Sequence, residues 1–357
     1  MSEPPRKSRK PANTAFKQQR LKSWQPILTP KSVLPTLFIL GAIFRTHRCD
    51  QFNPKILEIS IDYTKCKEHD SFHSIEHLFR SSLPNNSSSI FKGPKYKSEK
   101  TVIPGNPNDE TGFLCTIQFP ITVDIPPPVY LYYELTEFYQ NHRSYVKSVS
   151  WPQLRGEENL DIKALRDVCK PLAGKEVDGV FIPFYPCGLI ANSIFNDTIY
   201  QLTKTENQVV YEFSEKNIGL SADKERYKKP PYHPKEVLPP PYWVNRYTNG
   251  VYSDEQPPPD FSQDEHFWVW LRTAGLPRFR KLYGRNDTTV IPKGMYEIKI
   301  MMNYDISKYG GKKYIVFSTI GNLGGRNSFL GLAYISMGAV SVLLGILFTA
   351  RHFFKPR

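Results

Sequence analysis

The chain has 357 residues, of which 40% are hydrophobic and 13% aromatic, enough to bury a sizeable core and to exclude a fully disordered protein. Its 31 prolines argue against a mostly helical body. The formal net charge of +13 is concentrated in two short tails, whereas a nucleic-acid-binding protein carries its basic surface on the folded body, so we expect no nucleic-acid partner.

The first element is a basic tail over residues 1–31, in which eight basic side chains face one acidic side chain, a net charge of +7. A second tail, residues 351–357, carries a further +3, which leaves 32–350 with only +3. The positive-inside rule places basic tails that flank membrane segments in the cytoplasm. Two cytoplasmic tails require two membrane crossings.

The first apolar segment is short. Residues 33–44 are uncharged, but 12 residues of helix span about 18 Å, less than the hydrocarbon core of about 30 Å. Extending the helix brings in Arg45 and Arg48. A cleaved signal peptide is an alternative, but the preceding basic region is long and no small-x-small site follows. We predict a first transmembrane segment at 32–50, short and anomalous.

Residues 51–328 have the features of a lumenal or extracellular ectodomain. The chain has five cysteines, and an oxidising compartment favours their pairing as disulfides. Four of them fall within this region: Cys66, Cys115, Cys169 and Cys187. Cys49 lies in the anomalous stretch and is left over. Sequons for N-glycosylation also avoid the tails, and they occur at Asn85, Asn86, Asn196 and Asn286.

The ectodomain sequence is β-rich. Short runs of Ile, Val, Tyr and Phe predict strands at 55–63, 113–119, 129–135, 209–213, 296–303 and 313–319. Helices are plausible at 135–145 and 267–274. Proline clusters separate these elements and predict long surface loops. The fold class is therefore a membrane protein with a large, antiparallel, sandwich-like ectodomain.

Catalytic motifs are not found, and we predict no enzyme, no cofactor and no catalytic residue. His69, His73 and His77 would share one face of a helix, and three imidazoles could bind zinc in a lumenal hydrolase. The plainer interpretation is a solvated polar face, because Cys66 is better placed in a disulfide. We therefore predict no metal site.

The last apolar segment, residues 329–350, is a run of 22 residues without charge, followed by Arg351. A helix of that length spans about 33 Å, and we predict a transmembrane helix here. Gly331, Gly338 and Gly345 recur at a spacing of seven, close to one stripe of the helix. Glycine is common in membrane helices, but such a stripe also lets another helix approach closely.

Five motifs then follow one another in a fixed order. They are NTAFKQQRL with WQPIL (13–28), YYELTEFYQNHR (132–143), PCGLIANSIFNDT (186–198), WLRTAGLP with FRKLY (270–283), and GGRNSFLGLAY (324–334). With these motifs the chain strongly resembles the flippase β-subunit family, the "cell division control fifty" or "ligand-effect modulator three" proteins. The resemblance covers roughly residues 12–350.

The resemblance implies a non-catalytic accessory subunit and chaperone. Family members form a hetero-dimer with a type IV P-type ATPase that moves phospholipids, and the ATPase needs them to leave the endoplasmic reticulum and to work. They have two transmembrane helices, cytoplasmic termini and a disulfide-bonded, glycosylated, β-rich ectodomain. We expect the same here, with membrane lipids around the helices and a location in the endoplasmic reticulum, Golgi, endosomes and plasma membrane. The alternative is a self-standing membrane-anchored glycoprotein, such as a receptor or an adhesion module.

Site residues follow from the same resemblance. We expect the tail to dock on the ATPase through Phe16, Gln18, Gln19, Arg20 and Leu21, and the glycine stripe to face the partner. The pairing we expect is Cys66–Cys115 and Cys169–Cys187, with Cys49 free. Asn196, Asn286 and one of Asn85 or Asn86 should be glycosylated. Residues 45–55 depart from the family, which has apolar residues there, so we expect impaired insertion of the first crossing.

Overall fold

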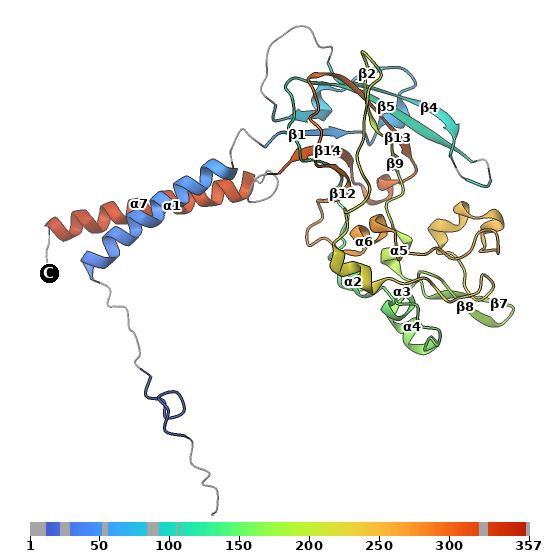
Figure 1. Cartoon of the computed structure of the whole chain (residues 1–357), viewed down its shortest axis with the longest axis horizontal. Coiled ribbons are helices and arrows are strands. Elements are labelled where there is room, and N and C mark those ends of the chain that lie inside the picture. The colour runs from blue at the N-terminus through green and yellow to red at the C-terminus, as the bar shows by residue number, and fades with distance from the viewer. Residues whose placement is uncertain are drawn as a thin grey trace, which may run out of the picture. The chain divides into compact units, whose positions relative to one another are not determined.

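The protein divides into two compact units, Met1–Phe52 with Asn327–Arg357, and Asn53–Arg326. The computed structural model describes residues 12–21, 29–51, 56–83, 93–104, 106–108, 110–320 and 328–354. Figure 1 shows the first unit as a pair of helices and the second as sheets with short helices. Each unit is described by itself below.

The helical unit consists of α1 (Pro30–Gln51) and α7 (Ser328–Phe354), which pack against each other in antiparallel directions. Phe38 of α1 lies beside Gly345, and the ring of Phe44 stacks on the ring of Tyr334 with centroids 5.8 Å apart. Among the described residues, one helix segment is long and apolar enough to cross a membrane, Gly331–Phe354, whereas the apolar part of α1, Pro30–Phe44, is shorter. The helix itself continues to Gln51, and a membrane crossing by α1 stays a prediction.

The larger unit contains two antiparallel sheets (Figure 1). The first has the order β12 (Phe279–Asn286), β6 (Val129–Leu135), β14 (Lys313–Thr319), β1 (Glu58–Asp62) and β3 (Phe79–Ser81). The second has the order β11 (Val210–Tyr211), β10 (Leu202–Lys204), β13 (Gly294–Met302), β5 (Thr111–Ile121), β4 (Lys95–Val102) and β2 (His73–Ser74), and β9 (Thr198–Ile199) also pairs with β13. A separate hairpin joins β7 (Gly174–Val177) and β8 (Val180–Pro183).

The two large sheets pack face to face through aromatic side chains. Phe119 of β5, in the second sheet, packs on two rings of the first sheet. Its ring centroid lies 5.5 Å from that of Phe317 in β14 and 6.3 Å from that of Phe79 in β3. Phe119 and Phe317 are buried in one hydrophobic core cluster that includes residues from both sheets. The prediction of a β-rich, antiparallel ectodomain is confirmed.

Short helices and loops gather beside the sheets (Figure 1). The α-helices are α2 (Arg143–Lys147), α3 (Trp151–Leu154), α4 (Ile162–Val168), α5 (Leu189–Asn192) and α6 (Glu265–Leu271). The 3-10 turns are η1 (Cys66–Glu68), η2 (Glu76–Leu78), η3 (Ser221–Arg226), η4 (Pro241–Arg246), η5 (Thr248–Gly250) and η6 (Ile306–Tyr309).

The helix predicted over 135–145 is wrong for most of its length. Strand β6 extends to Leu135, and Glu137 has a φ of 55°, which a right-handed helix does not admit. Only the end of the predicted span, from Arg143, is helical. The helix predicted over 267–274 exists as α6, which begins earlier because the side chain of Asp264 accepts a hydrogen bond from the N–H of Phe267 at 2.9 Å.

Both expected disulfides are present. Cys66–Cys115 ties η1 to β5 across a sequence separation of 49, and Cys169–Cys187 ties the end of α4 to the segment before α5 across a separation of 18. Closing such loops restricts the unfolded chain, by about 3–4 kcal/mol each in the chain-entropy account. The side chain of Cys49 lies outside the described part of the chain.

The histidine cluster does not form the helix face that zinc binding would need. His73 lies in strand β2, while His69 follows η1 and His77 lies in η2. The rings of His69 and His73 stack with centroids 4.2 Å apart. Over the described ranges, no group of three His, Cys, Asp or Glu side chains is arranged to hold a metal ion.

Candidate functional site

The contact between α1 and α7 is built on small residues. A Cβ atom added to Gly41 would lie 2.6 Å from Cγ2 of Val342 and 3.4 Å from the carbonyl oxygen of Gly338, so the two backbones approach closely. A Cβ added to Gly345 would lie 3.0 Å from Cζ of Phe38. Close approach of backbones gives helices in lipid the van der Waals contact that holds them together.

An apolar groove of about 450 Å³ opens on this helix pair. Its lining residues come from one position of α1 and one face of α7, and they are Gly41, Tyr334, Ile335, Gly338, Ala339, Val342, Leu343 and Ile346. Leu343 and Ile346 are more than half exposed in the chain alone. Exposed aliphatic side chains on this scale mark a surface for lipid or for another helix.

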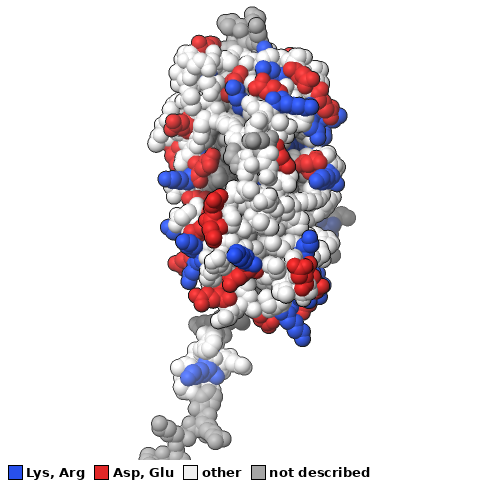
Figure 2. All heavy atoms as spheres, turned by 90° about the vertical axis from the view of Figure 1, so that its right-hand side faces the viewer, with Lys and Arg blue, Asp and Glu red and all other residues white. Residues whose placement is uncertain are grey.

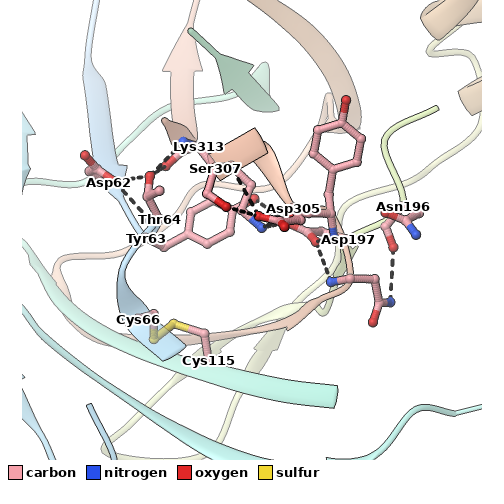
Figure 3. A network of polar contacts seen from close by, with 12 residues as sticks. Asp62, Tyr63, Thr64, Cys66, Cys115, Asn196, Asp197, Asp305, Ser307 and Lys313 are labelled. Atoms are coloured by element: carbon pink, nitrogen blue, oxygen red, sulfur yellow. Dashed lines mark hydrogen bonds and ion pairs between the residues drawn. A yellow bond between two sulfur atoms is a disulfide. The ribbon is translucent and has the colours of Figure 1, made fainter. Parts of the chain in front are cut away.

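The ectodomain contains a buried polar network that joins segments distant in sequence (Figure 3). Nζ of Lys313 lies 2.6 Å from Oδ2 of Asp197, and the hydroxyl of Tyr63 donates to the same oxygen at 2.9 Å. The other carboxylate oxygen, Oδ1, accepts the backbone N–H groups of Asn303 and Tyr304, each at 2.6 Å. Burial and the neighbouring carboxylate raise the pKa of Tyr63 well above its usual value. The network fixes the segment before β9 against β1 and β14.

The short helix α5 is a second meeting point. The indole N–H of Trp270 donates to the carbonyl of Ile190 at 2.8 Å, and that of Trp243 donates to the carbonyl of Ala191 at 3.1 Å. Gly188 precedes α5 with a φ of 98°, and a Cβ there would overlap the carbonyl of Ser148. The PCGLIANS motif and the WLRTAGLP motif are therefore parts of one structure.

The surface of this unit carries both signs of charge. Figure 2 shows Lys and Arg side chains interspersed with Asp and Glu side chains over one face of the molecule. Several of them form exposed ion pairs, among them Arg155 with Glu157 at 2.9 Å and Lys170 with Asp167 at 2.7 Å. Exposed pairs of this kind contribute little to stability.

Comparison with known proteins decides the family. The sequence pattern of the LEM3 (ligand-effect modulator 3) family / CDC50 family matches residues 51–357. The chain belongs to this family.

The similarity to individual family members extends over nearly the whole chain. A Saccharomyces cerevisiae protein named "Phospholipid-transporting ATPase accessory subunit CRF1" is 36% identical, over 98% of this chain and 87% of its own length. "Phospholipid-transporting ATPase accessory subunit CDC50" of Chaetomium thermophilum is 35% identical, over 98% and 88%. "Cell cycle control protein 50A" of Bos taurus is 37% identical, over 96% and 88%.

Residues 13–21 of the amino-terminal motif form a compact turn, and residues 22–28 lie outside the described residues. The backbone N–H of Arg20 donates to the carbonyl of Ala15 at 2.8 Å, and the guanidinium of Arg20 contacts the side chain of Asn13. Phe16 and Leu21 are 76% and 62% exposed. Docking of Phe16, Gln18, Gln19, Arg20 and Leu21 on a partner stays a prediction.

The glycine stripe has a use within the chain that sequence reasoning missed. Gly331, Gly338 and Gly345 are all buried, and the last two lie against α1. A contact of the same glycines with a partner's helix stays a prediction, and of the three only Gly338 also lines the groove.

The predicted glycosylation sites differ in their surroundings. Asn85 and Asn86 lie outside the described residues. Asn196 and Asn286 are both half-buried, and their occupancy stays a prediction. The charged residues of the buried network, Asp197 and Lys313, were not singled out from the sequence. Asp197 stands inside the PCGLIANSIFNDT motif, where it was considered only as the middle residue of a sequon.

Proposed function

We propose that this chain is the accessory subunit of a phospholipid-transporting type IV P-type ATPase, with which it forms a hetero-dimer and which it helps to leave the endoplasmic reticulum. The observation that carries the proposal is the extent of the similarity. Relatives named as accessory subunits of phospholipid-transporting ATPases match over 98% of this chain. A self-standing receptor or adhesion module would not need to preserve the tails and both helices along with the ectodomain. The chain itself is not an enzyme.

Both helices cross the membrane in this proposal. The apolar part of helix α1, Pro30–Phe44, is shorter than the hydrocarbon core of about 30 Å requires, so the proposed crossing includes the charged residues up to Gln51. Its antiparallel packing on α7 brings Pro30 and Phe354, where the two basic tails begin, to the same end of the pair. That arrangement agrees with two cytoplasmic tails.

The groove on α7 is the surface that we assign to the ATPase within the membrane. It is apolar and includes the small residues Gly338 and Ala339, so that a helix of the partner can approach α7 closely. The exposed Phe16 and Leu21 of the tail provide a second contact on the cytoplasmic side. The remaining exposed aliphatic side chains of α7 face membrane lipids.

The location follows from this role. A subunit that accompanies an ATPase from the endoplasmic reticulum occupies the endoplasmic reticulum, the Golgi or endosomes and the plasma membrane in turn. Its ectodomain then resides in an oxidising lumen, which agrees with the Cys66–Cys115 and Cys169–Cys187 disulfides.

Co-purification tests the proposal. The tagged full chain, extracted in mild detergent, should carry a type IV P-type ATPase of well over 100 kDa in a one-to-one ratio. Ala339→Phe, which fills the groove, should lower the amount of ATPase recovered at least several-fold. Leu347→Phe is the matched control, because Leu347 is 54% exposed on the same helix but does not line the groove. A chain that purifies without a large partner would favour the self-standing glycoprotein.

A further inference from the structure

The ectodomain contains a cavity of about 890 Å³ that the accessory role does not use. This volume falls within the range of about 300–1,000 Å³ typical of small-molecule sites. Its wall combines aromatic rings with polar side chains, among them Tyr242, Trp243, Tyr304, Asn303 and Arg246. The predicted glycosylation site Asn196 is part of the same wall.

The wall carries more acidic than basic side chains. The guanidinium of Arg246 lies over the ring of Trp243 at 4.7 Å, and the ammonium of Lys308 lies over the ring of Tyr242 at 5.1 Å. The carboxylates on the wall are more numerous, which disfavours an anionic ligand and offers acceptors to hydroxyl groups; they belong to Glu110, Asp197, Glu215, Asp264 and Asp305. Aromatic faces beside planar polar groups suit a sugar, whose C–H face packs on rings and whose hydroxyl groups exchange hydrogen bonds.

The backbone at the attachment point is held in place by a neighbouring side chain. The amide nitrogen of Asn303 donates to the backbone carbonyl of Asn196 at 3.2 Å. The adjacent residue Asp197 is fixed by the buried ion pair with Lys313. The position of Asn196 on the cavity wall is therefore well defined.

The two predicted glycosylation sites, Asn196 and Asn286, have different surroundings, as expected if one glycan packs into the protein and the other extends into solvent. The side-chain nitrogen of Asn286 donates to the carbonyl of Glu212 at 2.8 Å, and the residues that follow Asn286 are exposed. The carboxamide of Asn196, labelled in Figure 3, makes no hydrogen bond to another described residue, and Asn196 lines the cavity. Glycans are added before folding is complete, so a later burial does not prevent their addition.

We propose that the first N-acetylglucosamine residues of an N-glycan on Asn196 occupy this cavity, where they pack on the ring of Tyr242. The glycan thereby becomes part of the ectodomain core instead of a surface decoration. The proposal needs occupancy of Asn196 but not the ATPase partner, so its failure would leave the accessory role standing.

Protection from a glycosidase tests the proposal. The full chain is purified from a glycosylating host, treated with peptide-N-glycosidase in the native state, and the release is followed for each glycopeptide by mass spectrometry. The glycan of Asn286 should be released, whereas that of Asn196 should be released at least tenfold more slowly until the protein is denatured. Equal rates at the two sites, or an unmodified Asn196, would overturn the proposal.

A pair of variants distinguishes a glycan bound in the cavity from one that the nearby protein surface merely shields from the glycosidase. Tyr242 lines the cavity and is 54% exposed, and Tyr139 is 55% exposed but does not line it. Tyr242→Ala should speed the native release at Asn196 several-fold, and Tyr139→Ala should leave it unchanged. If the two variants behave alike, the cavity does not hold the sugars.

Loss of the glycan should also loosen the ectodomain. Thr198→Ala removes the sequon while Asn196 stays, and Thr198→Ser keeps the sequon. Thr198→Ala should lower the melting temperature by several degrees relative to Thr198→Ser. Thr288→Ala, which removes the sequon of Asn286, should not lower the melting temperature. A Thr198→Ala protein as stable as Thr198→Ser would contradict the proposal. If Thr198→Ala does not fold, the glycosidase measurement on the chain without substitutions still tests the proposal.

Discussion

At the scale of single residues, the ectodomain depends on charges that are taken out of water and paired. Lys313 and Asp197 are both buried. Asp197 also accepts hydrogen bonds from the hydroxyl of Tyr63 and the backbone N–H groups of Asn303 and Tyr304, and the ammonium of Lys313 also donates to the carbonyl of Tyr304. A buried pair adds little net stability compared with apolar residues, but removal of one partner leaves an uncompensated charge. Its main effect is to specify where the segment before β9 lies.

Lys313→Met should therefore destabilise the ectodomain strongly. Loss of one partner of a buried pair costs about 3–5 kcal/mol, which corresponds to a fall of roughly 10 °C in melting temperature for a unit of this size. The control is Lys312→Met, because Lys312 is 59% exposed and its nitrogen lies 3.8 Å from Asp62. The double variant Lys313→Met with Asp197→Asn should recover part of the loss. Equal melting temperatures for the two single variants would contradict this reasoning.

Lys281 gives a pH dependence of stability with a defined sign. Burial, with Arg272 nearby, lowers the pKa of Lys281 to about 8 from its ordinary 10.5. Its ammonium donates to the carbonyl of Val269 at 3.0 Å and to that of Arg272, at the end of α6. Because the unfolded chain binds the proton more tightly, stability is lower below pH 8 and rises as the pH increases from about 8 towards 10. Thermal melting of the unmodified chain should show this rise, and Lys281→Met should lack it. A rise of the same size in the variant would contradict the assignment.

At the scale of elements, the sequence predicts best the strands that are themselves rich in apolar and aromatic residues. The spans 129–135 and 313–319 coincide with β6 and β14, because most of their side chains are aliphatic or aromatic. Strand β12 was missed since it carries Arg280 and Lys281. Arg280 pairs with Glu134, which is distant in the sequence, and Lys281 donates to carbonyls at the end of the preceding helix α6, and neither contact is visible in a local pattern.

Only those features of the candidate site that depend on a single sequence motif could be predicted. The resemblance supplied the family and both disulfides, because cysteines and long motifs are visible in sequence. The groove and the ectodomain cavity could not be predicted, since each needs side chains from several elements brought together by the fold. The burial of the glycine stripe against α1 could not be predicted either. The spacing of Gly338 and Gly345 shows that they share one face of the helix, but it does not show which element packs on that face.

The close approach of α1 and α7 predicts the effect of adding a side chain. Gly41→Leu should separate the helices, because even its Cβ would lie 2.6 Å from Val342. Ala42→Leu is the control, since Ala42 is exposed on the same helix. Cysteines at positions 44 and 334, in a Cys49→Ser background, should cross-link quickly in the parent and in Ala42→Leu, and slowly in Gly41→Leu. Equal rates in all three would contradict the packing of this pair.

The short apolar part of α1 predicts impaired insertion. Residues beyond Phe44 add Arg45 and Arg48, and each costs about 2.5–3.5 kcal/mol at the centre of the membrane, partly relieved when the side chain reaches the interface. Replacement of residues 45–55 by an apolar stretch of similar length should raise the fraction of chains with a translocated, glycosylated ectodomain. If the unmodified chain is glycosylated and delivers the ATPase as well as the repaired one, the argument from span length is wrong.

At the scale of the whole molecule, the chain combines two basic tails, a helix pair with an apolar groove and a disulfide-bonded β-sandwich. One pair of helices cannot enclose a transport path for a phospholipid. The helix pair offers an apolar surface for another helix, and the larger unit is a separate compact body tied by two disulfides. This division of labour fits a subunit that holds and escorts a larger transporter.

Lipid transport by the partner tests this account most directly. The measurement is the uptake of fluorescent phospholipids by cells that express the co-purifying ATPase with or without this chain, together with the location of the ATPase. We expect transport at the cell surface only when both chains are present, and retention of the ATPase in the endoplasmic reticulum when this chain is absent. An ATPase that reaches the surface and moves lipid equally fast without this chain would contradict the central claim.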